Sequence, residues 1–109
     1  MRILDEFSSK SVDWTGLEHY REYGWQKQLH LFEVPFYYIE YGIAQLGAIG
    51  LWMQYKNNKE KALSNYMQAL SLGVTRTLPE LYDAAGLKFN FAKHQIKQLM
   101  DFVGEEMEK

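Results

Sequence analysis

Cysteine is absent from the 109-residue sequence, so the chain cannot form a disulfide bond or a thiolate metal site. This absence is typical of a cytoplasmic protein, and we predict that location. An excess of positive charge is missing too, because 12 lysines and arginines face 14 acidic residues and the net charge is −2. The sequence therefore lacks the basic surface that attracts nucleic acids or anionic membranes, and we expect neither as a partner.

Alternating apolar and polar runs long enough for a β-strand are also missing. Apolar residues nevertheless make up 47% of the chain and aromatic residues 16%, so the need for burial is high. The length allows one domain at most. The sequence predicts an all-α fold of about five helices, in which residues 1–109 form a single helical segment around one long central helix.

Proline is scarce, and Pro35 stands where the central helix is expected to begin. Its ring fits the first turn of a helix, where the missing N–H would be unpaired anyway, and it forces Val34 into an extended conformation. We predict an extended segment over residues 30–34 and one helix over about residues 36–55. The apolar run over residues 34–53 nearly reaches the length of a membrane span, about 20 residues. Because Glu40 lies inside it, we expect a buried central helix and no membrane span.

Three glycines in this run suit close packing against other helices: Gly42, Gly47 and Gly50. A further glycine, Gly24, lies inside a helix that the spacing of Thr15 and Glu18 predicts, because Thr-x-x-Glu is a capping box. That helix is expected to run to about Leu29. We expect Gly24 to allow a close backbone approach there, with loosening of the helix as the alternative.

Capping residues define the second half of the chain. The central helix should end near residues 56–58, where Asn58 can cap a helix over residues 59–72 that Gly73 closes. Thr77 and Glu80 form a second capping box, and the helix after it should end at Gly86. Asn90 should cap a last helix with apolar positions at helical spacing: Ala92, Ile96, Leu99, Met100 and Val103. We expect residues 105–109 to fray and residues 1–7 to be the end of another helix.

The tyrosines of the central segment define a candidate site. On the predicted helix, Tyr38 and Tyr41 are three residues apart and share a face, and Tyr37 lies four residues before Tyr41. His30 lies in the segment that leads into the helix. One imidazole and two or three phenols can thus converge on one spot. The alternative is that the tyrosines are core or interface aromatics and that His30 is an ordinary surface histidine.

A family resemblance favours the first interpretation. Residues 25–30 (WQKQLH) and 32–47 (FEVPFYYIEYGIAQLG) resemble the C-terminal part of the catalytic domain of oligoendopeptidase F. This family consists of zinc metallopeptidases related to thimet oligopeptidase. The resemblance continues through residues 75–82 and 84–87 and covers about residues 12–103. It implies that the chain is a fragment of a larger helical zincin catalytic domain.

The zinc motif of this family, His-Glu-x-x-His, is missing. The three histidines open the sequences His-Tyr-Arg-Glu-Tyr, His-Leu-Phe-Glu-Val and His-Gln-Ile-Lys-Gln, at His19, His30 and His94. None of these places two histidines one helical turn apart. The resemblance therefore implies a zinc ion in the full-length parent, no cofactor in this chain, and no activity of the chain alone.

The resemblance also implies roles for the site residues. In this family a histidine and two tyrosines from this region hydrogen-bond the substrate carbonyl and the intermediate of peptide hydrolysis. The matching residues are Tyr41 as the main oxyanion donor, His30 holding the substrate carbonyl or backbone, and Tyr38 beside the scissile bond. Tyr37 competes with Tyr38 for the last role. The substrate implied is a short peptide.

A function of another class remains open. The chain can be a non-catalytic helical module that acts alone or as a homo-oligomer. A central helix that is apolar on all sides needs helices around it, and four others are too few to cover it. An exposed apolar face of the central helix would then be the contact surface.

Overall fold

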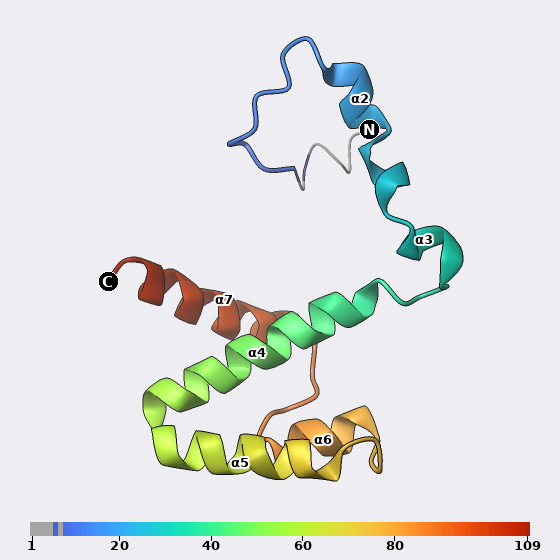
Figure 1. Ribbon diagram of the computed structural model, residues 1–109. Coiled ribbons are helices and arrows are strands. Elements are labelled where there is room, and N and C mark those ends of the chain that lie inside the picture. Colours follow the sequence, from blue (N-terminus) through green and yellow to red (C-terminus); the bar gives the residue numbers. More distant parts are fainter. Residues whose placement is uncertain (1–5, 7) are drawn as a thin grey trace. The chain divides into compact units, whose positions relative to one another are not determined.

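In a computed structural model, the described residues are Glu6 and 8–109, and they form six α-helices and one 3-10 helix with no β-strand among them (Figure 1). The fold class is therefore all-α, as the sequence predicts. The chain divides into two compact units, Met1–Tyr38 and Ile39–Lys109, which are described separately below. The helix end expected at residues 1–7 lies, apart from Glu6, outside the described residues.

The described residues of the first unit form three short helices, and the first two of them lie where one continuous helix is predicted. The three helices are α2 (Glu18–Glu22), the 3-10 helix η1 (Gly24–Lys27) and α3 (His30–Glu33). The capping box predicted at Thr15 and Glu18 is wrong. Leu17 occupies the position before α2, the Thr15 N–H donates to Asp13 Oδ1 at 2.9 Å, and Glu18 Oε1 accepts from the Gly16 N–H at 3.1 Å. An aspartate two residues upstream outcompetes the glutamate because it closes a tighter turn.

Gly24 lies where the helical run breaks. A Cβ atom added at Gly24 would meet no atom within 4 Å, so the expected close backbone approach is wrong. The α-helix ends at Glu22 and a 3-10 helix starts at Gly24. This pattern fits the alternative explanation, in which glycine weakens a helix by about 1 kcal/mol relative to alanine.

Pro35 does not begin the central helix. Val34 is extended, with φ −132° and ψ 97°, as a residue before proline should be. The next residue, Phe36, has φ 63°, which is incompatible with a right-handed helix. The central helix, α4, therefore begins later and runs over Ile39–Asn57, while residues 30–33 form a helical turn and are not extended.

Local capping sets the helices of the second unit. Helix α5 (Lys59–Leu72) begins where Asn58 Oδ1 accepts from the Lys61 N–H at 3.0 Å, and it ends at Gly73 with φ 52°. Helix α6 (Leu78–Ala84) begins with the predicted capping box. The Thr77 side chain accepts from the Glu80 N–H, and Glu80 Oε2 accepts from the Thr77 N–H at 2.7 Å. Both helices thus confirm the sequence prediction.

The last helix, α7 (Lys93–Met107), differs from the prediction at both ends. Ala92, and not Asn90, occupies the N-cap position. Asn90 lies two residues before it, and its Oδ1 accepts from the Ala92 N–H at 2.9 Å. The expected fraying from residue 105 is wrong, because the helix continues to Met107. The Glu106 carboxylate there pairs with Lys56 at 2.5 Å and with Lys109, which ties the end of α7 to the end of α4.

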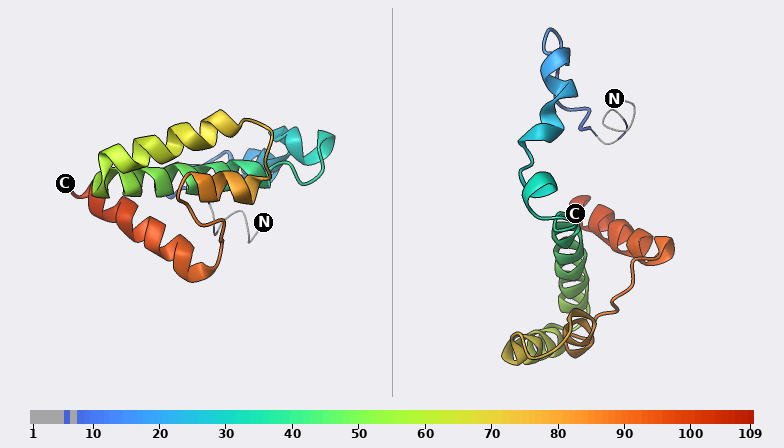
Figure 2. Two further views of the ribbon diagram at one scale, coloured as in Figure 1. Left: turned by 90° about the horizontal axis from the view of Figure 1, so that it is seen from below. Right: turned by 90° about the vertical axis from the view of Figure 1, so that its right-hand side faces the viewer.

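In the second unit, α5 packs against α4 and α6, and α7 packs against α4 (Figures 1 and 2). Figure 2 shows α4 and α5 diverging from their junction at Asn58. Two of the three glycines of α4 make the expected close contacts. An ideal Cβ on Gly47 would lie 2.6 Å from Tyr82 Oη, and one on Gly50 would lie 2.9 Å from Leu87 Cδ2. Gly42 faces open space, so a packing role is wrong there.

Little of the described chain is buried. The buried hydrophobic residues are Ala62, Ala85 and Leu99, and no large side chain among the described residues is fully buried. The buried residues of α4 are only Gly47 and Gly50, so the expectation of a buried central helix is wrong within this chain. In the part of the chain that is described, no helix combines the length and apolar character needed to cross a bilayer.

Candidate functional site

The predicted site residues lie in and beside the turn that follows α3. His30 is the first residue of α3, Tyr37 and Tyr38 lie in the turn after Pro35, and Tyr41 lies in the first turn of α4. Tyr38 is outside α4, so the helical spacing on which its pairing with Tyr41 was predicted does not apply. The turn replaces the helix because the Phe36 backbone has a positive φ.

The first unit brings three of the four residues together. The His30 imidazole stacks on the Tyr37 ring, with centroids 5.6 Å apart and planes 10° apart. The Tyr38 ring lies on the same histidine at 6.3 Å and is tilted by 49°. The turn makes this cluster possible because the Tyr37 N–H donates to the Val34 carbonyl at 3.2 Å and so returns the chain toward α3. The spatial association of His30 with both tyrosines is thus present in the structure.

A second aromatic pair links α3 to η1. The Trp25 ring of η1 and the Phe32 ring of α3 lie 5.7 Å apart. Such ring pairs contribute about 0.5–1.5 kcal/mol beyond the area that they bury. The pair fixes α3, and with it His30, relative to η1 inside the first unit.

Tyr41 belongs to the second unit. Its side chain is half exposed, as are those of Tyr37 and Tyr38. The convergence of Tyr41 with the His30 cluster stays a prediction.

The chemistry of the cluster is that of hydrogen-bond donors. An imidazole N–H and a phenol O–H can each donate to a carbonyl oxygen or to an oxyanion. The arrangement therefore suits the binding of a peptide carbonyl.

A zinc ion does not fit the described residues. His19, His30 and His94 lie on α2, α3 and α7, and none opens a His-Glu-x-x-His motif. Among Glu6 and residues 8–109, no group of three or more His, Asp or Glu side chains lies close enough to hold a metal ion.

Phe36 was missed by the sequence analysis. It combines a left-handed backbone, φ 63°, with a side chain that is 93% exposed. A bulky residue in this region costs about 1–3 kcal/mol, and such residues cluster at functional sites. The Val-Pro-Phe sequence was the only signal, and it was interpreted as the start of a helix.

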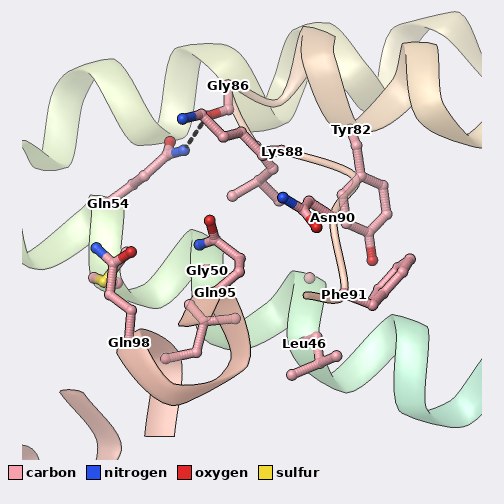
Figure 3. Close-up of a pocket in the computed structure, with 14 residues that line it drawn as sticks. Leu46, Gly50, Gln54, Tyr82, Gly86, Lys88, Asn90, Phe91, Gln95 and Gln98 are labelled. Carbon is pink, nitrogen blue, oxygen red and sulfur yellow. Dashed lines mark hydrogen bonds between the residues drawn. The ribbon is translucent and has the colours of Figure 1, made fainter. Parts of the chain in front are cut away.

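A hollow in the second unit was missed as well. It has a volume of 220 Å³ and lies between α4, α6, the segment after α6, and α7 (Figure 3). Carboxamide side chains surround it, and they come from Gln54, Asn90, Gln95 and Gln98. The spacing of Gln95 and Gln98 on one helix face was the available signal.

Comparisons with protein-family models, with curated proteins and with solved structures find no significant match to this chain. The functional argument therefore depends on the residues and their geometry.

Proposed function

We propose that this chain is the C-terminal part of the catalytic domain of a zinc endopeptidase similar to oligoendopeptidase F, which hydrolyses short peptides. The observation that supports the proposal is the cluster of His30 with Tyr37 and Tyr38. The family resemblance assigns substrate contacts to one histidine and two tyrosines, and the cluster contains the histidine and both candidates for one of the tyrosines. The ligands of the zinc ion would lie outside the described residues.

In this proposal the three principal residues divide the binding of the peptide bond between them. His30 holds the substrate carbonyl or backbone, Tyr38 lies beside the scissile bond, and Tyr41 donates to the oxyanion that forms during hydrolysis. Donors held about 3 Å from such an oxygen typically contribute 10²–10³ in rate each. Tyr37 is the alternative to Tyr38, because its ring also lies on His30.

The exposed apolar surface supports the view that the chain works as part of a larger body. Large hydrophobic side chains are exposed in both units, among them Leu29 and Phe32 in the first and Trp52 and Leu70 in the second. Monomeric proteins rarely leave such side chains in large contiguous patches. A further polypeptide that carries the zinc motif would cover them.

The test combines this chain with an N-terminal part of an enzyme similar to oligoendopeptidase F that carries His-Glu-x-x-His. A quenched fluorescent peptide reports hydrolysis. We expect turnover from the combination and none from the chain alone with zinc. Tyr41→Phe should then reduce kcat by about 10²–10³. The matched control is Tyr20→Phe, which removes an exposed phenol of α2 and should leave kcat unchanged.

Comparing Tyr37→Phe with Tyr38→Phe decides which phenol faces the substrate, because only that substitution should lower kcat. The proposal is wrong if Tyr41→Phe and Tyr20→Phe behave alike in an active combination. It is also wrong if the isolated chain hydrolyses the peptide.

A second candidate function is that of a non-catalytic helical module that forms a homo-oligomer. A specific observation favours it. A hollow of 300 Å³ between α4 and α5 is lined by apolar and aromatic side chains: Leu51, Trp52, Tyr55, Ala62, Leu63 and Tyr66. Four of these are exposed: Trp52, Tyr55, Leu63 and Tyr66. A second copy of the chain would cover this exposed face of the central helix.

Size-exclusion chromatography with light scattering tests this function. We expect a dimer or larger species that Leu63→Glu converts to a monomer, because it places a charge in the apolar hollow. The control is Lys61→Glu, which also adds negative charge to α5 but outside that hollow. A chain that is monomeric at every concentration and binds no hydrophobic dye would rule out the oligomer.

A further inference from the structure

The 220 Å³ hollow of the second unit carries a binding inference that is independent of the proposed peptidase role (Figure 3). We propose that this hollow is a binding site for a small organic carboxylate that has an apolar body and an amide group, such as an N-acylated amino acid. The described residues that line it come from α4, α6, α7 and the segment between α6 and α7.

Close packing holds the wall of the hollow in place. Tyr82 Oη donates to the Ile43 carbonyl of α4 at 2.6 Å, and its ring lies directly against Gly47. Leu87 lies against Gly50 in the same way. Because glycine at these two positions lets α6 and its following segment approach α4 closely, the site is largely formed before a ligand enters.

Two of the carboxamides are oriented by the backbone. Gln54 Nε2 donates to the Gly86 carbonyl at 2.5 Å, which leaves the Gln54 Oε1 as an acceptor (Figure 3). Asn90 Oδ1 accepts from the Ala92 N–H at 2.9 Å, which leaves the Asn90 Nδ2 as a donor. A fixed acceptor and a fixed donor match the N–H and C=O of an amide.

Gln95 and Gln98 add two further carboxamides from α7. They lie three residues apart on one face of that helix, and both line the hollow (Figure 3). The site thus offers several neutral hydrogen-bonding groups at fixed places, which is the usual basis of orientation and specificity in small-molecule sites.

The charged side chain in the lining indicates the charge of the ligand. Of the described residues that line the hollow, Lys88 is the only one with a charged side chain, and no aspartate or glutamate lines it. An ammonium group without a lining carboxylate favours an anion, and a carboxylate can accept hydrogen bonds from both Lys88 and a carboxamide.

The apolar part of the lining and the volume restrict the body of the ligand. Leu46, Met53, Phe91 and Leu99 contribute the apolar lining. The volume of 220 Å³ is below the range of about 300–1,000 Å³ that is usual for drug-sized ligands. A ligand of about amino-acid size with one apolar side chain fits these limits.

The test titrates the full isotope-labelled chain with N-acetyl-leucine and, separately, with the uncharged N-acetyl-leucinamide, and follows the NMR signals. We expect saturable shifts in the side-chain amide signals of Gln54, Asn90, Gln95 and Gln98. The acid should bind about fivefold more tightly than the amide, because an exposed ion pair contributes up to about 1 kcal/mol.

Lys88→Gln keeps a polar side chain and removes the charge. It should weaken the acid about fivefold and leave the binding of the amide unchanged. The control is Lys93→Gln on α7, which causes the same loss of charge at an exposed residue that does not line the hollow. Shifts that do not saturate, equal binding of acid and amide, or equal effects of the two substitutions would each overturn the proposal.

Discussion

The contact between Gly47 and Tyr82 leads to a prediction that can be worked out from the structure. Tyr82 Oη donates to the Ile43 carbonyl at 2.6 Å, and it would lie 2.6 Å from a Cβ atom added at Gly47. The same hydroxyl therefore makes the hydrogen bond and would clash with the methyl group of an alanine. Removing the hydroxyl and adding the methyl group should not have independent effects on stability.

Tyr82→Phe should lower the free energy of unfolding by about 1 kcal/mol, the usual net contribution of one hydrogen bond. Gly47→Ala should gain about 1 kcal/mol in helix propensity. That gain is outweighed by overpacking of about 1–3 kcal/mol and by the lost hydrogen bond. We therefore expect Gly47→Ala to lower the free energy of unfolding by about 2 kcal/mol.

The double variant should be more stable than the sum of the single effects predicts. Once the hydroxyl is gone, the nearest ring atom to the new methyl group is Tyr82 Cζ at 3.0 Å, which a small ring movement relieves. We expect a coupling free energy of about 1–2 kcal/mol, within the range for residues in contact.

Urea unfolding of the four proteins, followed by circular dichroism, measures this coupling. Gly42→Ala is the matched control in the same helix, because a Cβ atom there meets no atom within 4 Å. It should stabilise the chain by up to about 1 kcal/mol. Additive effects of the Gly47 and Tyr82 substitutions would refute the contact, and a destabilising Gly42→Ala would refute the reasoning from open space.

The titration of Tyr82 provides a second measurement on the same contact. Burial raises the pKa of the Tyr82 phenol above its ordinary value of 10.0. The folded state thus favours the neutral phenol, so its contribution to stability is complete below pH 10 and is lost as the pH rises above that value. The difference in unfolding free energy between the natural chain and Tyr82→Phe should therefore shrink above pH 10. A difference that stays constant there would contradict the burial of the phenol.

Three further predictions concern helix ends. Asn58→Ala removes the N-cap of α5 and should lower the free energy of unfolding by about 1 kcal/mol in urea; no change would contradict the cap. Hydrogen bonds from the Thr77 hydroxyl and then its N–H lower the pKa of Glu80, so this carboxylate stabilises the chain above its ordinary pKa of 4.5 and less as the pH falls below it. Glu80→Gln should therefore flatten the pH dependence of the urea midpoint between pH 6 and pH 3, and an unaltered profile would contradict the box. Glu106→Gln removes the pair with Lys56 and should speed amide hydrogen exchange in the last turn of α7, whereas unchanged exchange would contradict the tie between the helix ends.

The helices that the sequence predicts correctly are those whose ends carry complete local signals. Asn58 caps α5 three residues from its partner N–H, and Gly73 supplies the positive φ at the other end. Thr77 and Glu80 form the capping box at the start of α6. Such contacts span only three residues, so the sequence alone contains all the participants.

Two of the wrong predictions fall where two local signals compete. Thr15 can pair with Glu18 or with Asp13, and the structure has the pair with Asp13. Pro35 is compatible with a helix start or with a turn, and the turn forms with Phe36 at φ 63°. At Thr15 the nearer carboxylate forms the pair, whereas at Pro35 the residue type does not decide, because proline suits both the first turn of a helix and a β-turn.

The predicted pairing of Tyr38 with Tyr41 depends on one helix that contains both residues. That part of the prediction is wrong, because Tyr38 precedes α4. The structure instead gathers Tyr37 and Tyr38 around His30 by a turn that the helix model did not contain. The contacts of His30 with Tyr37 and Tyr38 are present, whereas the role of these residues in a site stays a prediction.

The small number of buried side chains connects the fold to both candidate functions. Hydrophobic burial is the main favourable term in folding, and the buried hydrophobic residues of the described chain are two alanines and one leucine. Capping and ion pairs contribute about 1 kcal/mol each and cannot replace a core. Either a peptidase domain or a second copy of the chain would supply the missing contacts, and the two differ in what they bury. A peptidase partner must leave the His30 cluster open to a peptide, whereas a second copy must cover the apolar hollow beside Leu63. Two measurements on one complex therefore separate the functions: the solvent protection of Leu63 and the response of the His30 signal to added peptide. If Leu63 is protected and His30 still responds, both surfaces are used.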